Sequence, residues 1–269
     1  ISSNRPEWLM ADMATHAQVE NVWDSLKALN VAEKTIPVTY MNSSAAIKSF
    51  TGKNGGAVCT SSNAMRAMNW AFEKGEKVLF LPDQHLGRNT AVLSLGLSLE
   101  DCVLWNPWKA NGGLSDSEIQ NAKVILWRGH CSVHGRFSLE NITQMRAKVP
   151  GIQILVHPEC QHEVVSNADV VGSTEMIIKT IESSAPGSKW AVGTELNLVQ
   201  RLANRFSDRE VHFLDKTVCY CSTMNRIDLP HLVWAMESLV SGRLVNQISV
   251  DSETSKYAKV ALERMLALP

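Results

Sequence analysis

The chain alternates short apolar runs with polar, glycine-rich turns through most of its length. Many of the turns lead into a segment whose apolar residues recur at helical spacing. Strands that alternate with helices of about ten residues predict βαβ units, and therefore parallel sheets covered by helices. We expect strands at 35–40, 57–59, 78–81, 102–104, 124–127, 152–156, 170–171, 190–192 and 211–214.

These strands fall into two stretches of similar size, which predicts an internal structural repeat. The loosest stretch, 111–114, contains two adjacent glycines and marks the expected boundary. We therefore predict one αβα unit over 31–111 and a second over 112–218. Residues 1–30 would form a remnant and a linker helix. The tail, 219–269, would hold a helix at 229–239, a short strand at 247–250 and a final amphipathic helix.

The composition is that of an ordinary globular protein. The chain has 269 residues, of which 45% are hydrophobic and 20% charged, and its net charge of -1 gives no reason to expect nucleic acid or an anionic membrane as a partner. No apolar run approaches the roughly 18 residues of a membrane helix. The N-terminus is polar and lacks the apolar region of a signal peptide. We predict a cytoplasmic location.

Cysteines are the most informative residue type in this chain. Six cysteines in a chain of this length do not make a disulfide scaffold, and in a reducing compartment they more often bind metal or act in catalysis. Cys59 and Cys102 are best interpreted as small core residues. The turns after three expected strands carry a different set of thiols, imidazoles and a carboxylate: Cys131, His157, Glu159, Cys160, Cys219 and Cys221.

Ligands collect at the carboxyl ends of parallel strands, so the fold should gather these groups. No spacing among them matches a zinc finger. A zinc site built from cysteine and histidine on an α/β scaffold is one interpretation that the residues leave open.

Seven motifs, read in order, resemble one family over essentially the whole chain from Met10 onward. They are Tyr40–Ser44, Cys59–Ala64, Pro82–Gly87, Gly129–His134, His157–Cys160, Gly172–Thr174 and Cys221–Met224. Together they resemble quinolinate synthase, an iron–sulfur enzyme of NAD biosynthesis. The residues at 83–90 and 219–221 are similar to those of the actinobacterial branch of the family in particular.

The resemblance implies three similar αβα domains around a pseudo-threefold axis, with the active site at the centre. It implies condensation of iminosuccinate with dihydroxyacetone phosphate to give quinolinate. It also implies a [4Fe-4S] cluster held by three cysteines, with one iron acting as a Lewis acid in dehydration. The L-aspartate oxidase that supplies iminosuccinate is a further expected partner.

The resemblance also assigns roles to individual residues. Cys131 and Cys221 match two cluster ligands, and the Cys-x-x-Met pattern favours Cys221 over Cys219. The expected catalytic residues are Tyr40, Glu159 and His157. Tyr40 could donate a proton to a developing oxyanion, and Glu159 is the expected general base, with a pKa raised by its enclosure.

The expected substrate-binding residues are Tyr40, Asn42, Ser61, His157, Glu159, Ser173 and Thr174. Ser173 and Thr174 could bind a carboxylate with their hydroxyls and the N-terminus of the next helix. Taken alone, the His157–Glu159 motif would more often be an ordinary loop, and the Ser173–Thr174 motif would be a weak signal. His85, His130 and His134 are expected in supporting or surface positions rather than in catalysis.

The chain departs from the family pattern near its N-terminus. The family begins with a further domain that carries a histidine and a tyrosine of the active site and the first cluster cysteine, and here Trp8 stands at that cysteine's position. We therefore expect a first domain that is largely missing and a chain that catalyses poorly alone. The tail would return to the first-domain position, and apolar faces of the first helix and the tail would promote association. A non-catalytic homologue is the other interpretation left open.

Overall fold

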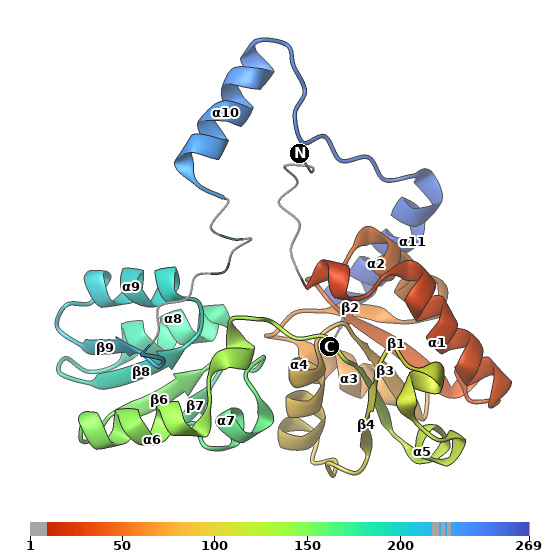
Figure 1. Ribbon diagram of the computed structural model, residues 1–269, viewed down its shortest axis with the longest axis horizontal. Helices are drawn as coiled ribbons and strands as arrows, with labels where there is room; N and C mark the ends of the chain where they lie inside the picture. The colour runs from red at the N-terminus through yellow and green to blue at the C-terminus, as the bar shows by residue number, and fades with distance from the viewer. Residues whose placement is uncertain (1–9, 217–220, 222–223, 225–226, 269) are drawn as a thin grey trace.

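Two parallel sheets, each covered by helices on both faces, form the body of the molecule (Figure 1). The computed structural model describes residues 10–216, 221, 224 and 227–268. One sheet has five strands in the order β2-β1-β3-β5-β4, and the other has four in the order β7-β6-β8-β9. The predicted α/β class with parallel sheets is confirmed.

The strands begin and end within about one residue of the positions predicted from the apolar runs. They are β1 Thr35–Tyr40, β2 Ala57–Cys59, β3 Lys77–Leu81, β4 Cys102–Trp105, β5 Val124–Trp127, β6 Gln153–Val156, β7 Val170–Val171, β8 Lys189–Gly193 and β9 Glu210–Phe213.

The division between the sheets differs from the predicted boundary between residues 111 and 112. Strand β5 pairs with both β3 and β4, so it belongs to the first sheet, and the chain changes sheets between Trp127 and Gln153. The loose 111–114 stretch is a turn inside a βαβ unit. Asn111 and Gly112 have positive φ there, and a Cβ on Gly112 would lie 2.4 Å from the Trp105 ring. Glycine is needed here for a close packing contact, and the adjacent glycines were wrongly interpreted in the sequence as a flexible linker between domains.

Helices cover the first sheet on both sides. Helices α1 (His16–Ala28), α2 (Ala45–Lys53) and α5 (Asp116–Asn121) share one core layer, and α3 (Ala64–Phe72) and α4 (Gln84–Asn89) share the other. The apolar stripe of α1 is fully used, since Val22 and Leu26 are buried in the first layer. The expectation that the first helix exposes an apolar face is therefore wrong.

The second sheet is built in the same way. Helices α6 (Leu139–Lys148) and α7 (His162–Ser166) pack on one face, and α8 (Thr174–Ser183) and α9 (Leu196–Arg205) pack on the other. Ser173 and Glu195 accept hydrogen bonds from first-turn backbone N–H groups, which makes α8 and α9 begin directly after their strands. None of the described helices is long and apolar enough to cross a lipid bilayer.

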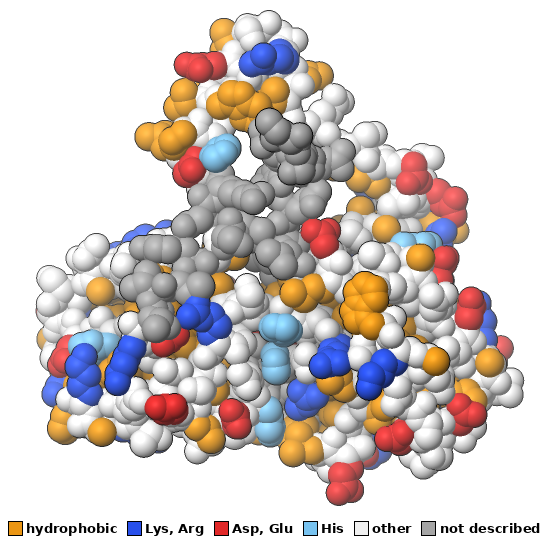
Figure 2. Space-filling model, viewed as in Figure 1, with side chains coloured by type: hydrophobic (Ala, Val, Ile, Leu, Met, Phe, Trp, Pro, Cys, Tyr) orange, Lys and Arg blue, Asp and Glu red, His pale blue; other side chains and the backbone are white. Residues whose placement is uncertain are grey.

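The tail holds α10 (Leu229–Val240) and α11 (Ser252–Leu266), as predicted, but 247–250 is an exposed segment and not a strand. Neither sheet has a strand from the described part of the tail. Helix α10 lies apart from both sheets, with hydrophobic side chains over its surface (Figures 1 and 2). Helix α11 packs on α2 and β2. The return of the tail to a first-domain position stays a prediction, and Cys219 and Trp8 lie outside the described residues.

Candidate active site

Two adjoining cavities lie where the carboxyl ends of the two sheets approach each other. The larger, of about 580 Å³, is lined by Tyr40, Asn42, His157, Glu159 and Thr174 among others. The smaller, of about 60 Å³, is lined by both Cys131 and Cys221. The two cavities share walls, and the lining residues common to both are Asn42, His134, Glu159, Glu195 and Met224.

Strand register explains why residues distant in the sequence meet at these cavities. Tyr40 ends β1, Cys131 follows β5, and His157 follows β6 directly. Val156 of β6 pairs with Gly193 of β8, and the His157 N–H donates to the Gly193 carbonyl at 3.1 Å. The parallel register aligns these strand ends within each sheet, and the cavity lining shows that the ends of β1, β5, β6 and β8 meet at one place, as expected for ligand sites of such sheets.

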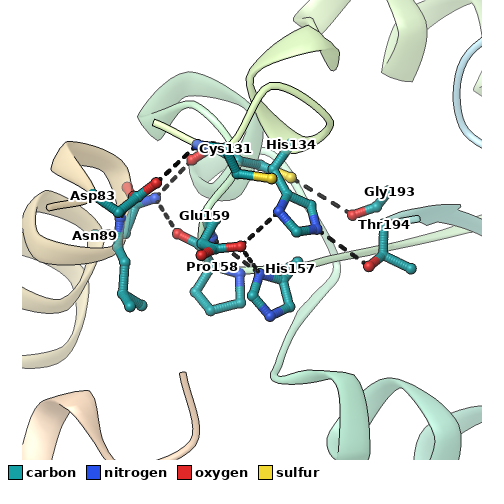
Figure 3. Close-up of polar contacts among 11 residues, drawn as sticks. Asp83, Asn89, Cys131, His134, His157, Pro158, Glu159, Gly193 and Thr194 are labelled. Carbon is teal, nitrogen blue, oxygen red and sulfur yellow. Dashed lines mark hydrogen bonds and ion pairs between the residues drawn. The ribbon is translucent and has the colours of Figure 1, made fainter. Parts of the chain in front are cut away.

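Asp83 holds the loop that carries Cys131. Its Oδ2 accepts a hydrogen bond from the Cys131 N–H at 3.0 Å, and its Oδ1 accepts one from the Leu86 N–H at 2.7 Å (Figure 3). Asp83 thus caps α4 and aims the cysteine loop with the same carboxyl group. Burial, and then the nearby charge of Glu159, raise the pKa of Asp83 to about 8.

Glu159 lies against two stacked imidazoles (Figure 3). Its Oε2 is 2.7 Å from Nδ1 of His134 and 3.3 Å from Nδ1 of His157, and the two rings stack with centroids 4.4 Å apart. All three side chains are at least nine-tenths buried. The Oε1 atom of Glu159 is also buried, and it has no hydrogen-bond partner among the described residues.

This packing separates the pKa values of the three groups. Burial alone would raise the pKa of Glu159, but the contacts and charges of His134 and His157 outweigh it and lower that pKa below the usual range. Burial would lower the pKa of His134, yet the adjacent Cys131 and Glu159 raise it to about 10. Burial and the charge of His134 lower the pKa of His157. The site therefore favours one carboxylate paired with one imidazolium.

The Glu159 pKa is a correction to the sequence analysis, which expected it to be raised toward neutral. The expectation considered enclosure and no partner. The partner is His134, a residue that the sequence analysis assigned to a supporting or surface position, and it is only 8% exposed. An opposite charge in contact outweighs the desolvation that would otherwise raise a carboxyl pKa.

Asn89 fixes the loop that carries Glu159. Its Nδ2 donates to the carbonyls of Pro158 at 2.8 Å and Cys160 at 2.9 Å, and its Oδ1 lies 2.9 Å from Nδ1 of His162. Asn89 ends α4 of the first unit, whereas the loop belongs to the second. One buried amide therefore links the two units beside the site.

Tyr40 also lines the larger cavity, and it stays protonated. Burial, and then the charge of Glu159, raise the pKa of Tyr40 well above its usual value, while a hydrogen bond with Ser61 opposes the shift. The Asn42 loop is supported by Lys48, whose Nζ donates to the Met41 carbonyl at 2.8 Å. Burial lowers the pKa of Lys48 to about 8.

The structure brings most of the proposed substrate-binding residues to the larger cavity. Tyr40, Asn42, His157, Glu159 and Thr174 line it. Ser61 is placed by its contact with Tyr40, and Ser173 caps α8 by accepting a hydrogen bond from the Met176 N–H. The sequence reasoning did not find the supporting contacts of Asp83, Asn89 and Thr194. Of these three residues, only Asp83 could have been found from the sequence, because it is a helix-capping residue type placed just after an expected strand.

Thiol, imidazole and carboxylate donors close to one another give the site the chemistry of a metal centre. Ligand atoms of Cys131, His134 and Glu159 all lie within 4.8 Å of one another. Cys221 faces the same small cavity as Cys131. Thiolates are the usual ligands of iron–sulfur clusters, and a set of cysteine, histidine and carboxylate also suits zinc. The residues present therefore fit a bound metal group.

Comparison with known proteins agrees with this geometry. Residues 3–267 match the family described as "Quinolinate synthetase A protein". The chain is 68% identical over 262 residues to a quinolinate synthase of Streptomyces coelicolor, covering 97% of this chain and 66% of that protein. It is 65% identical over 266 residues to one of a Nocardioides species, covering 97% and 68%. For Corynebacterium glutamicum the identity is 52% over 259 residues, covering 96% and 66%.

The chain thus spans about two thirds of the length of these curated relatives. The match runs through both sheets, the two cysteines and the His157–Glu159 loop. The chain belongs to the quinolinate synthase family.

Proposed function

We propose that this chain provides the catalytic site of a quinolinate synthase. The reaction condenses iminosuccinate with dihydroxyacetone phosphate, forms one carbon–carbon and one carbon–nitrogen bond to close the ring, and releases one phosphate and two waters. The observation that carries the proposal is the shared wall between a cavity lined by two cysteines and a polar cavity lined by Tyr40, His157 and Thr174. Family membership supports the same reaction.

The larger cavity suits small anionic substrates. Its volume of about 580 Å³ lies in the range of small-ligand sites. Thr174 begins α8, where backbone N–H groups and the helix dipole favour a carboxylate or a phosphate. Asn42 and His157 add neutral donors and acceptors that could fix the orientation of the substrate.

A [4Fe-4S] cluster is the metal group that we propose for the smaller cavity, with Cys131 and Cys221 as ligands. When bound, it would supply a Lewis-acidic iron that helps a hydroxyl group to leave. Asp83 would keep the Cys131 loop in place through its hydrogen bond to the Cys131 N–H. The third ligand expected from the resemblance falls at the position of Trp8, outside the described residues.

Tyr40 and Glu159 are the proposed proton-handling groups. Tyr40 keeps its proton because burial raises its pKa, so it can donate a hydrogen bond to a developing oxyanion. Glu159 lines both cavities, and its buried Oε1 has no hydrogen-bond partner among the described residues. Its carboxylate is the group that would accept a proton from a substrate carbon or water.

The test is anaerobic reconstitution with iron and sulfide, followed by an absorption spectrum and a quinolinate assay. We expect broad visible absorption and quinolinate formation. Both should be lost in Cys131→Ser and Cys221→Ser and retained in Cys102→Ser, a matched control because Cys102 lines a separate cavity. A colourless protein with bound zinc would favour the zinc interpretation. A protein that binds neither would favour a non-catalytic homologue.

The same assay, run beside the longer Streptomyces coelicolor relative, measures the low turnover expected from the sequence. Equal turnover of the two proteins would show that expectation to be wrong. Contact with L-aspartate oxidase and a cytoplasmic location are further proposals that rest on the family resemblance.

A further inference from the structure

We propose that Thr194 is a positioning residue that holds the His134 ring against Glu159. The catalytic part of this inference rests on the proposed function, whereas the structural part does not. The Thr194 Oγ1 lies 3.2 Å from Nε2 of His134 (Figure 3). The opposite ring nitrogen, Nδ1, is the atom that lies 2.7 Å from the Glu159 carboxylate. The three side chains thus form a chain of contacts that ends at the proposed base.

The position of Thr194 is fixed by the sheet. It directly follows β8, whose Gly193 pairs with Val156, so Thr194 lies beside His157 at the ends of neighbouring strands. A Cβ on Gly193 would approach the Val156 side chain to 3.0 Å and that of Leu214 to 3.1 Å, which shows how closely this strand end is packed. Thr194 is 3% exposed, and its β-branched side chain has few accessible rotamers. Its hydroxyl is therefore a rigid reference point.

His134 needs such a reference point more than most histidines. It precedes an irregular turn and belongs to a short 3₁₀ segment, so no long helix or strand orients it. Its Nδ1 does not form a well-aligned hydrogen bond, although it lies close to Glu159. Stacking on His157 sets the plane of the ring, and the Thr194 contact at Nε2 fixes how the ring is turned within that plane. Partners on the far nitrogen of a functional imidazole commonly set its orientation in this way.

A hydroxyl is well suited to this task. It can donate to a neutral Nε2 or accept from a protonated one, so the contact persists whichever form the ring takes. Valine has the same shape but offers neither role. In Thr194→Val the Nε2 atom would be buried without a partner, so the ring would lose the contact that fixes its rotation within the stack with His157.

The first experiment observes His134 directly in protein without metal. Histidine ring nitrogens are labelled with ¹⁵N, and the His134 signals are assigned with His134→Gln. We expect Thr194→Val to shift or broaden the His134 signals alone, and Thr194→Ser to leave them close to wild type. Thr51→Val is the matched control, since Thr51 is also fully buried and its hydroxyl donates to the Ile47 carbonyl within α2. Unchanged His134 signals in Thr194→Val would overturn the proposal.

The second experiment measures kinetics of the reconstituted protein. Losing the orientation of one hydrogen-bonded group should lower kcat by about tenfold in Thr194→Val, leave KM within about twofold, and be rescued in Thr194→Ser. A raised KM with an unchanged kcat would mean that Thr194 binds substrate instead. If only the serine variant folds, by circular dichroism, Thr194 is a folding residue and the proposal fails.

The two experiments separate this inference from the proposed function. If the His134 signals respond as expected but wild type forms no quinolinate, the positioning contact stands and the proposed function fails. If wild type is active while the His134 signals ignore Thr194→Val, the positioning role fails and the proposed function stands.

Discussion

Asn89 offers the sharpest test of how the site is held together, because one side chain serves two backbone carbonyls across the boundary between the units. It is 3% exposed, and its donors reach the Pro158 and Cys160 carbonyls at 2.8 and 2.9 Å. The substitution is Asn89→Leu, which nearly keeps the volume and removes both donors. The described residues offer those two carbonyls no other donor.

The expected loss of stability follows from the carbonyls left behind. A buried polar group without a partner costs about 1–3 kcal/mol, so two give about 2–6 kcal/mol. Some relaxation toward water is expected, and we predict about 3 kcal/mol, a large share of the roughly 5–15 kcal/mol that stabilises a typical domain. Urea unfolding measures this global effect.

The loss should be concentrated in the loop that carries Glu159. Hydrogen exchange of the amides at 157 and 159–161 should rise by about a hundredfold, the factor that corresponds to about 3 kcal/mol. Asn54→Leu is the control, since Asn54 donates a single local bond to the Phe50 carbonyl. A loss below about 0.5 kcal/mol, or unchanged exchange in the loop, would refute the reasoning.

Three further predictions test other features of the fold and site. Glu159→Gln should lower kcat by at least about a hundredfold while the cluster absorption remains, because an amide cannot accept the proton; a near-normal kcat would exclude Glu159 as the base. Burial lowers the pKa of Lys48 to about 8 from its usual 10.5, so between these pH values the unfolded chain binds one more proton than the folded chain. The free energy of unfolding, measured by urea titration, should therefore rise with pH over this range in wild type relative to Lys48→Met, and the same pH dependence in both proteins would contradict the reasoning. Gly52→Ala would place a Cβ 2.0 Å from the Tyr257 carbonyl of α11, so thermal unfolding should show a clear loss of stability, and an unchanged Tm would disprove the close approach.

The sequence predicted the strands well and the sheet boundary poorly, for a physical reason. The apolar run at 124–127 identifies β5 as a buried strand from local information alone. Whether it pairs forward or backward depends on β3 and β4, which are distant contacts that local pattern does not encode. The predicted strand at 247–250 was wrong for a related reason. It has an alternating pattern, but none of the strands in the described part of the chain pairs with it.

The candidate site shows the same division between local and distant information. Glu159 and Cys131 were found because they lie in the turns that follow strands β6 and β5, where ligands collect. His134 was undervalued because its importance lies in contacts with Glu159 and with Thr194, which stand 25 and 60 residues away in the chain. The predicted direction of the Glu159 pKa shift was wrong for the same reason. A charge partner can be identified only once the fold has placed it.

The packing of α11 on α2 and β2 has a consequence for folding during translation. The strands of the first sheet are complete by Trp127, yet the helix that covers its β2 edge begins at Ser252. At about 5–20 residues per second, the ribosome needs roughly 6–25 s to synthesise the intervening segment. During that time the surface that receives Ala258 and Ala261 has no cover, although the second sheet is already being assembled. Of the two units described, the one translated earlier is thus the one finished later, and a chaperone that binds nascent chains would find its apolar target there.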